Sequence, residues 1–167
     1  GSWLEDQDFL RFSGIFRDVY LFTVPDVHVY DIKVQTLLDD DYRDALLTLD
    51  LKLLGTKRGR ATITLRTEDG EEVLSVQERL AGESSFGYDV TAPVKWSAEK
   101  PVLYELTIEV SDAKGKLQEV IREYVGFRRF EIIDSIMYLN GKRIIFHGAN
   151  RHEFSARSGR VLPVEDT

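Results

Sequence analysis

Short runs of alternating apolar and polar residues fill most of the chain between residues 25 and 128, with turn residues between them. Such alternation places the apolar side chains of a strand on one face, because successive side chains point to opposite sides. One buried and one solvated face per strand predict an all-β fold, an immunoglobulin-like antiparallel β-sandwich in which two sheets share a core. No long stretch has a helical period. Seven strands are expected, at residues 27–37, 45–54, 60–66, 72–78, 85–91, 102–111 and 117–128.

Two charged clusters fall between these strands. The acidic triplet at residues 39–41 lacks the alternating ligands and the glycine of a calcium loop, so it predicts a hairpin turn. The basic cluster at residues 57–60 predicts a solvated turn, with residues 55–59 reversing the chain direction.

Two aromatic residues bear on the type of sandwich. Trp96 is a candidate for the aromatic plug of an immunoglobulin-like core, and Tyr104 for a corner tyrosine whose hydroxyl bonds to main chain a few residues upstream. An ordinary buried tyrosine is the alternative for Tyr104, and the sequence leaves both readings open.

The segments that flank the sandwich carry apolar residues as well. Residues 3–24 predict a two-sided apolar strand with a bulge at Gly14 and an end at Pro25. Residues 128–134 predict a further extended segment. Because such strands need cover, we expect them to add to the sandwich, to each other or to a second copy of the chain, as in a homo-oligomer.

A hairpin is expected around Asn140-Gly141, the residue pair that best fits a two-residue turn with positive φ. Its second strand would run through the apolar residues 144–146 and be buried on both faces. Several residues capable of chemistry follow at its carboxyl end: His147, Asn150, Arg151, His152 and Glu153. In α/β barrels, that end of a strand is where site residues lie.

Composition excludes several classes of protein and partner. The net charge of −7 and a pI near 5.0 argue against a nucleic-acid partner, because binding to a phosphate backbone depends on clustered lysine and arginine. No apolar run has the length that a bilayer requires, so no membrane association is expected. The chain has no cysteine, which is compatible with a cytoplasmic location. No zinc pair, phosphate-binding loop or nucleophile elbow occurs.

Six motifs, taken in chain order, resemble the β-galactosidases of glycoside hydrolase family two. They are Trp3-Leu4-Glu5-Asp6-Gln7-Asp8, Ser13-Gly14-Ile15-Phe16-Arg17-Asp18-Val19, Trp96-Ser97-Ala98-Glu99, Val125-Gly126-Phe127-Arg128, Leu139-Asn140-Gly141-Lys142 and Asn150-Arg151-His152-Glu153. The second motif by itself would also suit a β-glucuronidase or a β-mannosidase.

The resemblance implies a domain organisation. Residues 1–25 would hold the last strand of a sugar-binding jelly roll, residues 26–127 the immunoglobulin-like sandwich, and residues 128–167 the start of a catalytic (β/α)8 barrel. Both ends of the chain look truncated. The implied activity is retaining hydrolysis of terminal β-galactosides such as lactose.

The resemblance also implies roles for two residues. Asp8 would lie at the galactose subsite and near a monovalent cation, and His152 would approach the sugar in the transition state. Magnesium and sodium are implied for the complete enzyme. Its general acid and its nucleophile, both Glu, would lie beyond residue 167, so this chain contains no catalytic residue and is expected to be inactive alone, acting as a structural spacer. Phe154 and Ala156 stand where better-known members of the family often carry His and Pro, a difference that concerns the aglycone side of the substrate site.

Two alternatives stay open. The parent could be a β-glucuronidase-like relative of the same family, or the chain could be a free carbohydrate-binding module. An exposed aromatic platform would favour the module, whereas the strand faces indicate core.

Overall fold

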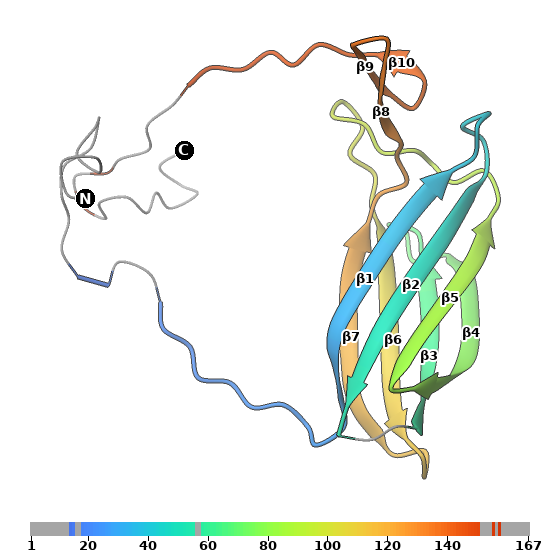
Figure 1. The fold of residues 1–167 in the computed structure, drawn as a ribbon, viewed down its shortest axis with the longest axis vertical. Helices are drawn as coiled ribbons and strands as arrows, with labels where there is room; N and C mark the ends of the chain where they lie inside the picture. The colour runs from blue at the N-terminus through green and yellow to red at the C-terminus, as the bar shows by residue number, and fades with distance from the viewer. Residues whose placement is uncertain (1–13, 16–17, 56–57, 151–154, 156, 158–167) are drawn as a thin grey trace. The chain divides into compact units, whose positions relative to one another are not determined.

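The computed structural model describes residues 14–15, 18–55, 58–150, 155 and 157. The chain divides into two compact units, residues 24–145 and residues 1–23 with 146–167, and each is considered by itself. The larger unit contains ten β-strands among the described residues, and these are drawn as arrows in Figure 1. The described residues contain no helix long and apolar enough to cross a bilayer.

Seven strands form two antiparallel layers, as the sequence predicts (Figure 1). One sheet has the order β1-β2-β5 and the other the order β4-β3-β6-β7. The strand bounds are β1 (His28–Leu38), β2 (Ala45–Leu54), β3 (Arg58–Arg66), β4 (Glu72–Ala81), β5 (Glu83–Val90), β6 (Tyr104–Asp112) and β7 (Leu117–Val125). All-β class and antiparallel pairing are therefore confirmed.

The core lies between the two layers and is built from the alternating positions. Ile63 of β3 pairs with Ile108 of β6, and both are 0% exposed. Leu49 of β2 is also 0% exposed and pairs with Phe86 of β5. Period-two alternation thus produces the buried faces, because every second side chain of a strand points to the same side and the register aligns these positions between paired strands.

The buried aromatic of this core is Phe127 and not Trp96, so the plug predicted at Trp96 is wrong. Phe127 is fully buried, and its ring meets that of Tyr104 edge-on at 5.0 Å. Trp96 is half-buried beside the strands, and the guanidinium of Arg128 lies over its ring at 4.5 Å. Trp96 is not in the core because it lies in the irregular segment between β5 and β6, called the Trp96 segment below, which contacts the main chain of Phe127.

Tyr104 bonds to main chain, as the corner hypothesis predicts, but its partner lies further upstream than expected. Its hydroxyl accepts a 2.8 Å hydrogen bond from the backbone N–H of Val94, ten residues upstream. The side chain is 4% exposed, so the bond satisfies a polar atom inside the core.

A smaller antiparallel sheet follows the sandwich and has the order β10-β9-β8. It consists of β8 (Phe130–Ile133), β9 (Ile136–Leu139) and β10 (Lys142–Arg143), and is called the meander below. The predicted hairpin turn is confirmed, because Asn140 and Gly141 have φ values of 51° and 76°. The expectation that residues 128–134 are extended and add to other strands is also confirmed by β8.

The basic turn is shorter than predicted, because Arg58 and Arg60 already belong to β3. Gly59 pairs with Leu80 on one side and Asp112 on the other. A Cβ at this glycine would lie 2.8 Å from the carbonyl oxygen of Ser111. Gly59, which the sequence suggested as a turn residue, therefore lies within β3, where the absence of a side chain allows the neighbouring backbone to pack closely.

Two predicted strands are wrong for the residues that the structure describes. Residues 14–15 and 18–24 belong to no strand, and Leu21 is 100% exposed. The second hairpin strand ends at Arg143, which leaves Ile145 63% exposed and Phe146 69% exposed. In both cases no described strand pairs with the segment, and an extended chain without a partner forms no ladder.

Candidate functional site

The sequence-predicted site residues Asp8 and His152 lie outside the described residues, as do Arg151 and Glu153. His147 and Asn150 are described, and both are exposed in a segment without regular structure. In the part of the chain that the structure describes, no group of three His, Cys, Asp or Glu residues could hold a metal ion. Among the described residues, a network of polar contacts lies where the meander meets the sandwich.

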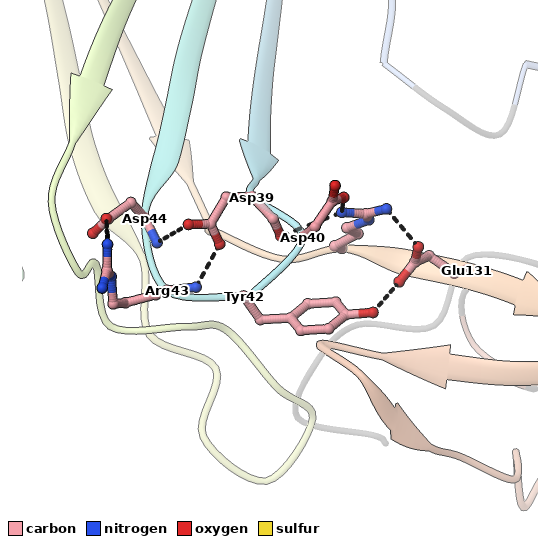
Figure 2. Close-up of polar contacts among 7 residues, drawn as sticks. Asp39, Asp40, Tyr42, Arg43, Asp44 and Glu131 are labelled. Carbon is pink, nitrogen blue, oxygen red and sulfur yellow. Dashed lines mark hydrogen bonds and ion pairs between the residues drawn. The ribbon is translucent and has the colours of Figure 1, made fainter.

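This arrangement, called the junction cluster, consists of Asp39, Asp40, Tyr42, Arg129 and Glu131. Figure 2 shows it with the neighbouring residues Arg43 and Asp44. The first three residues come from the β1–β2 turn, and the last two come from the start of the meander.

The β1–β2 turn is shaped by its own acidic residues, so the hairpin turn predicted at residues 39–41 is confirmed. The Asp39 carboxylate accepts hydrogen bonds from the backbone N–H groups of Arg43 at 2.7 Å and Asp44 at 3.1 Å (Figure 2). Tyr42 has a φ of 54°, which turns the chain back into β2. The turn thereby presents the Asp40 carboxylate and the Tyr42 ring toward the meander.

Arg129 joins the two elements through three oxygen atoms. Its Nη1 donates to the Asp40 carboxylate at 2.8 Å and to the Asp39 carbonyl at 3.2 Å. Its Nη2 lies 2.8 Å from the Glu131 carboxylate. The hydrogen bond to Asp40 is the main cause that raises the pKa of Arg129 above its ordinary value.

Tyr42 completes the cluster on the meander side. Its hydroxyl donates a 2.7 Å hydrogen bond to Glu131, and this bond is the main reason why the pKa of Tyr42 is raised (Figure 2). The Arg129 guanidinium lies 5.6 Å from the centre of the Tyr42 ring, within range of a cation–π contact. The ring also packs so closely on Gly141 that a Cβ there would lie 2.7 Å from it.

The polar groups of the junction cluster bind one another and so attach the meander to the sandwich. Both carboxylates that face Arg129 accept hydrogen bonds from it, and the Tyr42 hydroxyl donates its hydrogen bond to Glu131. A charge-assisted network in which one guanidinium bridges two carboxylates fixes their relative orientation. We infer that the junction cluster sets the angle at which the meander leaves the sandwich.

A groove of about 390 Å³ is lined by residues of β1, by the end of β7 with Gly126 and Arg128 after it, and by Trp96 and Leu103. A sugar-binding groove would present an uncovered aromatic face, since sugars stack on such faces. Here the Arg128 guanidinium lies over the Trp96 ring at 4.5 Å, while Tyr124 is 61% exposed at the rim. The groove therefore lacks a platform of two open aromatic rings.

Sequence reasoning did not find the junction cluster. The available signal was charge complementarity between the acidic triplet and the pair Arg128-Arg129. These segments are about 90 residues apart, so only the fold could show which charges meet.

Comparisons with known proteins agree with the observed architecture. The model of Glycosyl hydrolases family 2 matches residues 27–128, and the model of the TIM barrel domain of Glycosyl hydrolases family 2 matches residues 130–167. The chain is 47% identical to a β-galactosidase of Halalkalibacterium halodurans and 47% identical to one of Clostridium acetobutylicum, over 99% of its own length in each case. It spans 17% and 18% of the length of these relatives.

Solved structures resemble the chain as well. β-Glucuronidase 3 of Bacteroides uniformis superposes with a TM-score of 0.81 at 29% identity, over 96% of this chain and 20% of that one. A β-glucuronidase of Parabacteroides merdae, with a TM-score of 0.73 at 22% identity over 85% of this chain and 19% of its own, shares the fold. Because the family model covers more than half of the 167 residues, this chain belongs to glycosyl hydrolase family 2.

Proposed function

We propose that the chain is part of a retaining β-galactosidase that hydrolyses terminal β-galactosides such as lactose. The observation that carries the proposal is 47% identity, over 99% of the chain, to two proteins named β-galactosidase. In this view the sandwich is a spacer that fixes its neighbouring domains. The junction cluster supports that role, because it ties the sandwich to the segment where the match to the barrel domain begins.

The proposed organisation assigns residues 1–25 to a sugar-binding jelly roll, residues 26–127 to the sandwich and residues 128–167 to the barrel. The two family models, which meet between residues 128 and 130, support the second boundary. The meander nevertheless belongs to the same compact unit as the sandwich, up to Ile145. The match to the barrel domain therefore begins at residue 130, whereas the compact unit that contains the sandwich includes the whole meander.

Asp8 and His152 are proposed to bind substrate in the complete enzyme. A carboxylate accepts hydrogen bonds from sugar hydroxyls, and an imidazole can strengthen a hydrogen bond as oxocarbenium character develops. Retention also needs one carboxylate as nucleophile and another as acid and base. The resemblance places both of these Glu residues beyond residue 167, so this chain alone is expected to lack activity.

Magnesium and sodium belong to the proposal for the complete enzyme. The described residues offer no cluster of acidic and histidine ligands for magnesium. Asp8 is the candidate ligand for the monovalent cation and lies outside them. A cytoplasmic location is also proposed, and it rests on the absence of cysteine.

A chimeric enzyme tests the proposal. This chain would replace the matching segment of the Halalkalibacterium halodurans β-galactosidase, and hydrolysis of nitrophenyl β-galactoside and nitrophenyl β-glucuronide would be measured. We expect β-galactoside hydrolysis, with His152→Ala lowering kcat more than it raises KM. Selective hydrolysis of the glucuronide would overturn the assignment and favour the second candidate, a β-glucuronidase, which the resemblance to the Bacteroides uniformis enzyme suggests.

A free carbohydrate-binding module is tested with the isolated chain. Calorimetric titration with galactose and with longer glycans should show no saturable binding. Saturable binding to the isolated chain would contradict the spacer role and favour the module.

A further inference from the structure

Asn140 ties three parts of the backbone together through its side-chain amide. Its Oδ1 accepts a 2.9 Å hydrogen bond from the backbone N–H of Arg129, and its Nδ2 donates a 3.0 Å bond to the carbonyl of Trp96. Its own backbone N–H donates to the carbonyl of Arg129 at 2.8 Å. One side chain therefore holds the β9–β10 turn, the start of the meander and the Trp96 segment together.

The orientation of this amide is fixed by chemistry. A backbone N–H can only donate and a backbone carbonyl can only accept, so the oxygen of Asn140 must face Arg129 and the NH2 group must face Trp96. A carboxylate at this position would still accept from Arg129. It would, however, place an acceptor against the acceptor at Trp96.

Asn140 is followed by Gly141, and this pair is chemically labile. The backbone nitrogen of a glycine meets little obstruction, because no side chain shields it. Once deprotonated, it can attack the side-chain carbonyl carbon of the preceding asparagine. In the fold, both ends of that amide are held by Arg129 and Trp96, and the Tyr42 ring packs on Gly141.

We propose that Asn140-Gly141 is a conditional deamidation site that the junction keeps unreactive until the meander detaches from the sandwich. In the reaction the Gly141 nitrogen bonds to Cγ of Asn140, and ammonia leaves with the side-chain nitrogen. Solvent water then opens the resulting succinimide at either carbonyl and yields aspartate or isoaspartate. No oxidant or further reactant takes part.

The modification would be self-reinforcing. The product loses the donor that binds the Trp96 carbonyl, and isoaspartate also lengthens the backbone inside a two-residue turn. Each modified molecule would hold its meander less firmly than before. The fraction of modified Asn140 would thus increase irreversibly with the time that the junction has spent open.

The first experiment compares the folded chain with the same chain unfolded in urea, at the same mildly alkaline pH. Trypsin releases residues 130–142, which contain Asn140, and mass spectrometry follows conversion of the amide to the acid. We expect the folded chain to react at least about 100-fold more slowly, equivalent to an opening free energy of about 2.8 kcal/mol. A difference of less than about tenfold would overturn the protection.

The second experiment loosens the junction without touching Asn140. Tyr42→Phe removes the 2.7 Å bond to Glu131 and should accelerate deamidation of the folded chain about fivefold. Glu131→Gln, which removes the negative charge that pairs with Arg129, should act in the same direction.

The matched control is Tyr88→Phe, which removes another tyrosine–glutamate hydrogen bond, to Glu78 in the sandwich. It should leave the rate at Asn140 unchanged. Thermal unfolding of each variant checks that the sandwich is intact. Equal rates in Tyr42→Phe, Glu131→Gln and the control, with the sandwich folded in all three, would overturn the proposal.

Discussion

At the scale of single residues, Tyr104 shows how a buried hydroxyl is satisfied by main chain. Its bond to Val94 N–H spans ten residues and connects β6 to the irregular segment before Trp96. Tyr104→Phe should lower the free energy of unfolding by about 1 kcal/mol, the usual net value of one hydrogen bond. Urea denaturation measures this, with Tyr30→Phe as control because Tyr30 is 71% exposed. Equal midpoints for both variants would contradict the prediction.

Asp112 belongs to the residue scale as well, through its effect on the β6–β7 turn. Hydrogen bonds from the backbone N–H groups of Lys116 and Lys114 lower its pKa below the ordinary 3.8. Because the pKa is lower in the folded state, ionised Asp112 stabilises the fold at higher pH. That stabilisation is lost as the pH falls through 3.8 and then through the folded-state pKa.

We therefore expect Asp112→Asn to flatten the dependence of unfolding free energy on pH in the acid range. Chemical denaturation at a series of pH values from about 7 to about 3 measures it. Glu109→Gln, a charge-neutralising change in the preceding strand, is the matched control. If both variants had the pH profile of the parent chain, the turn would not contribute to acid sensitivity.

At the scale of elements, the meander is attached by side chains and not by a shared sheet. The three sheets are separate, and Arg129 is the residue that reaches Asp40 and Glu131 at once. Arg129→Met should increase amide hydrogen exchange in β8 and β9 and leave β2 and β3 unchanged. Arg129→Lys should restore protection only in part, because an ammonium cannot reproduce the planar fork of a guanidinium.

The control for Arg129 is Arg122→Met, which breaks an exposed ion pair with Glu105 at 3.5 Å. Exposed pairs of this kind contribute little, so exchange in the meander should not change. Faster exchange throughout the sandwich in Arg129→Met would show that the two elements unfold together.

At the scale of the whole molecule, the meander exposes apolar side chains that would favour association. Ile132 is 68% exposed, Phe130 is 48% exposed and Ile133 is 46% exposed. We predict that the isolated chain self-associates through this surface and that Ile132→Glu shifts it toward the monomer. Analytical ultracentrifugation measures the shift, with Leu117→Glu, a change at a 52% exposed position in β7, as control. A parent chain that stays monomeric at high concentration would refute this.

The sequence by itself predicted most of the fold of the larger unit. All seven sandwich strands, the acidic hairpin turn and the Asn140-Gly141 turn follow from alternation and turn preferences, and the structure contains each of them. These features could be predicted because they are local. Side-chain alternation and the tolerance for positive φ act over a few neighbouring residues.

Only the tertiary structure decided which distant residues meet. Phe127 replaces Trp96 in the core, Gly59 lies in a strand, and residues 18–24 have no strand partner among the described residues. The junction cluster joins Asp40 to Arg129 across about 90 positions, and the local sequence around either residue does not predict the other as its partner. The physical reason is that burial and ion pairing depend on how the sheets pack, whereas the alternating pattern specifies only which face of each strand is apolar.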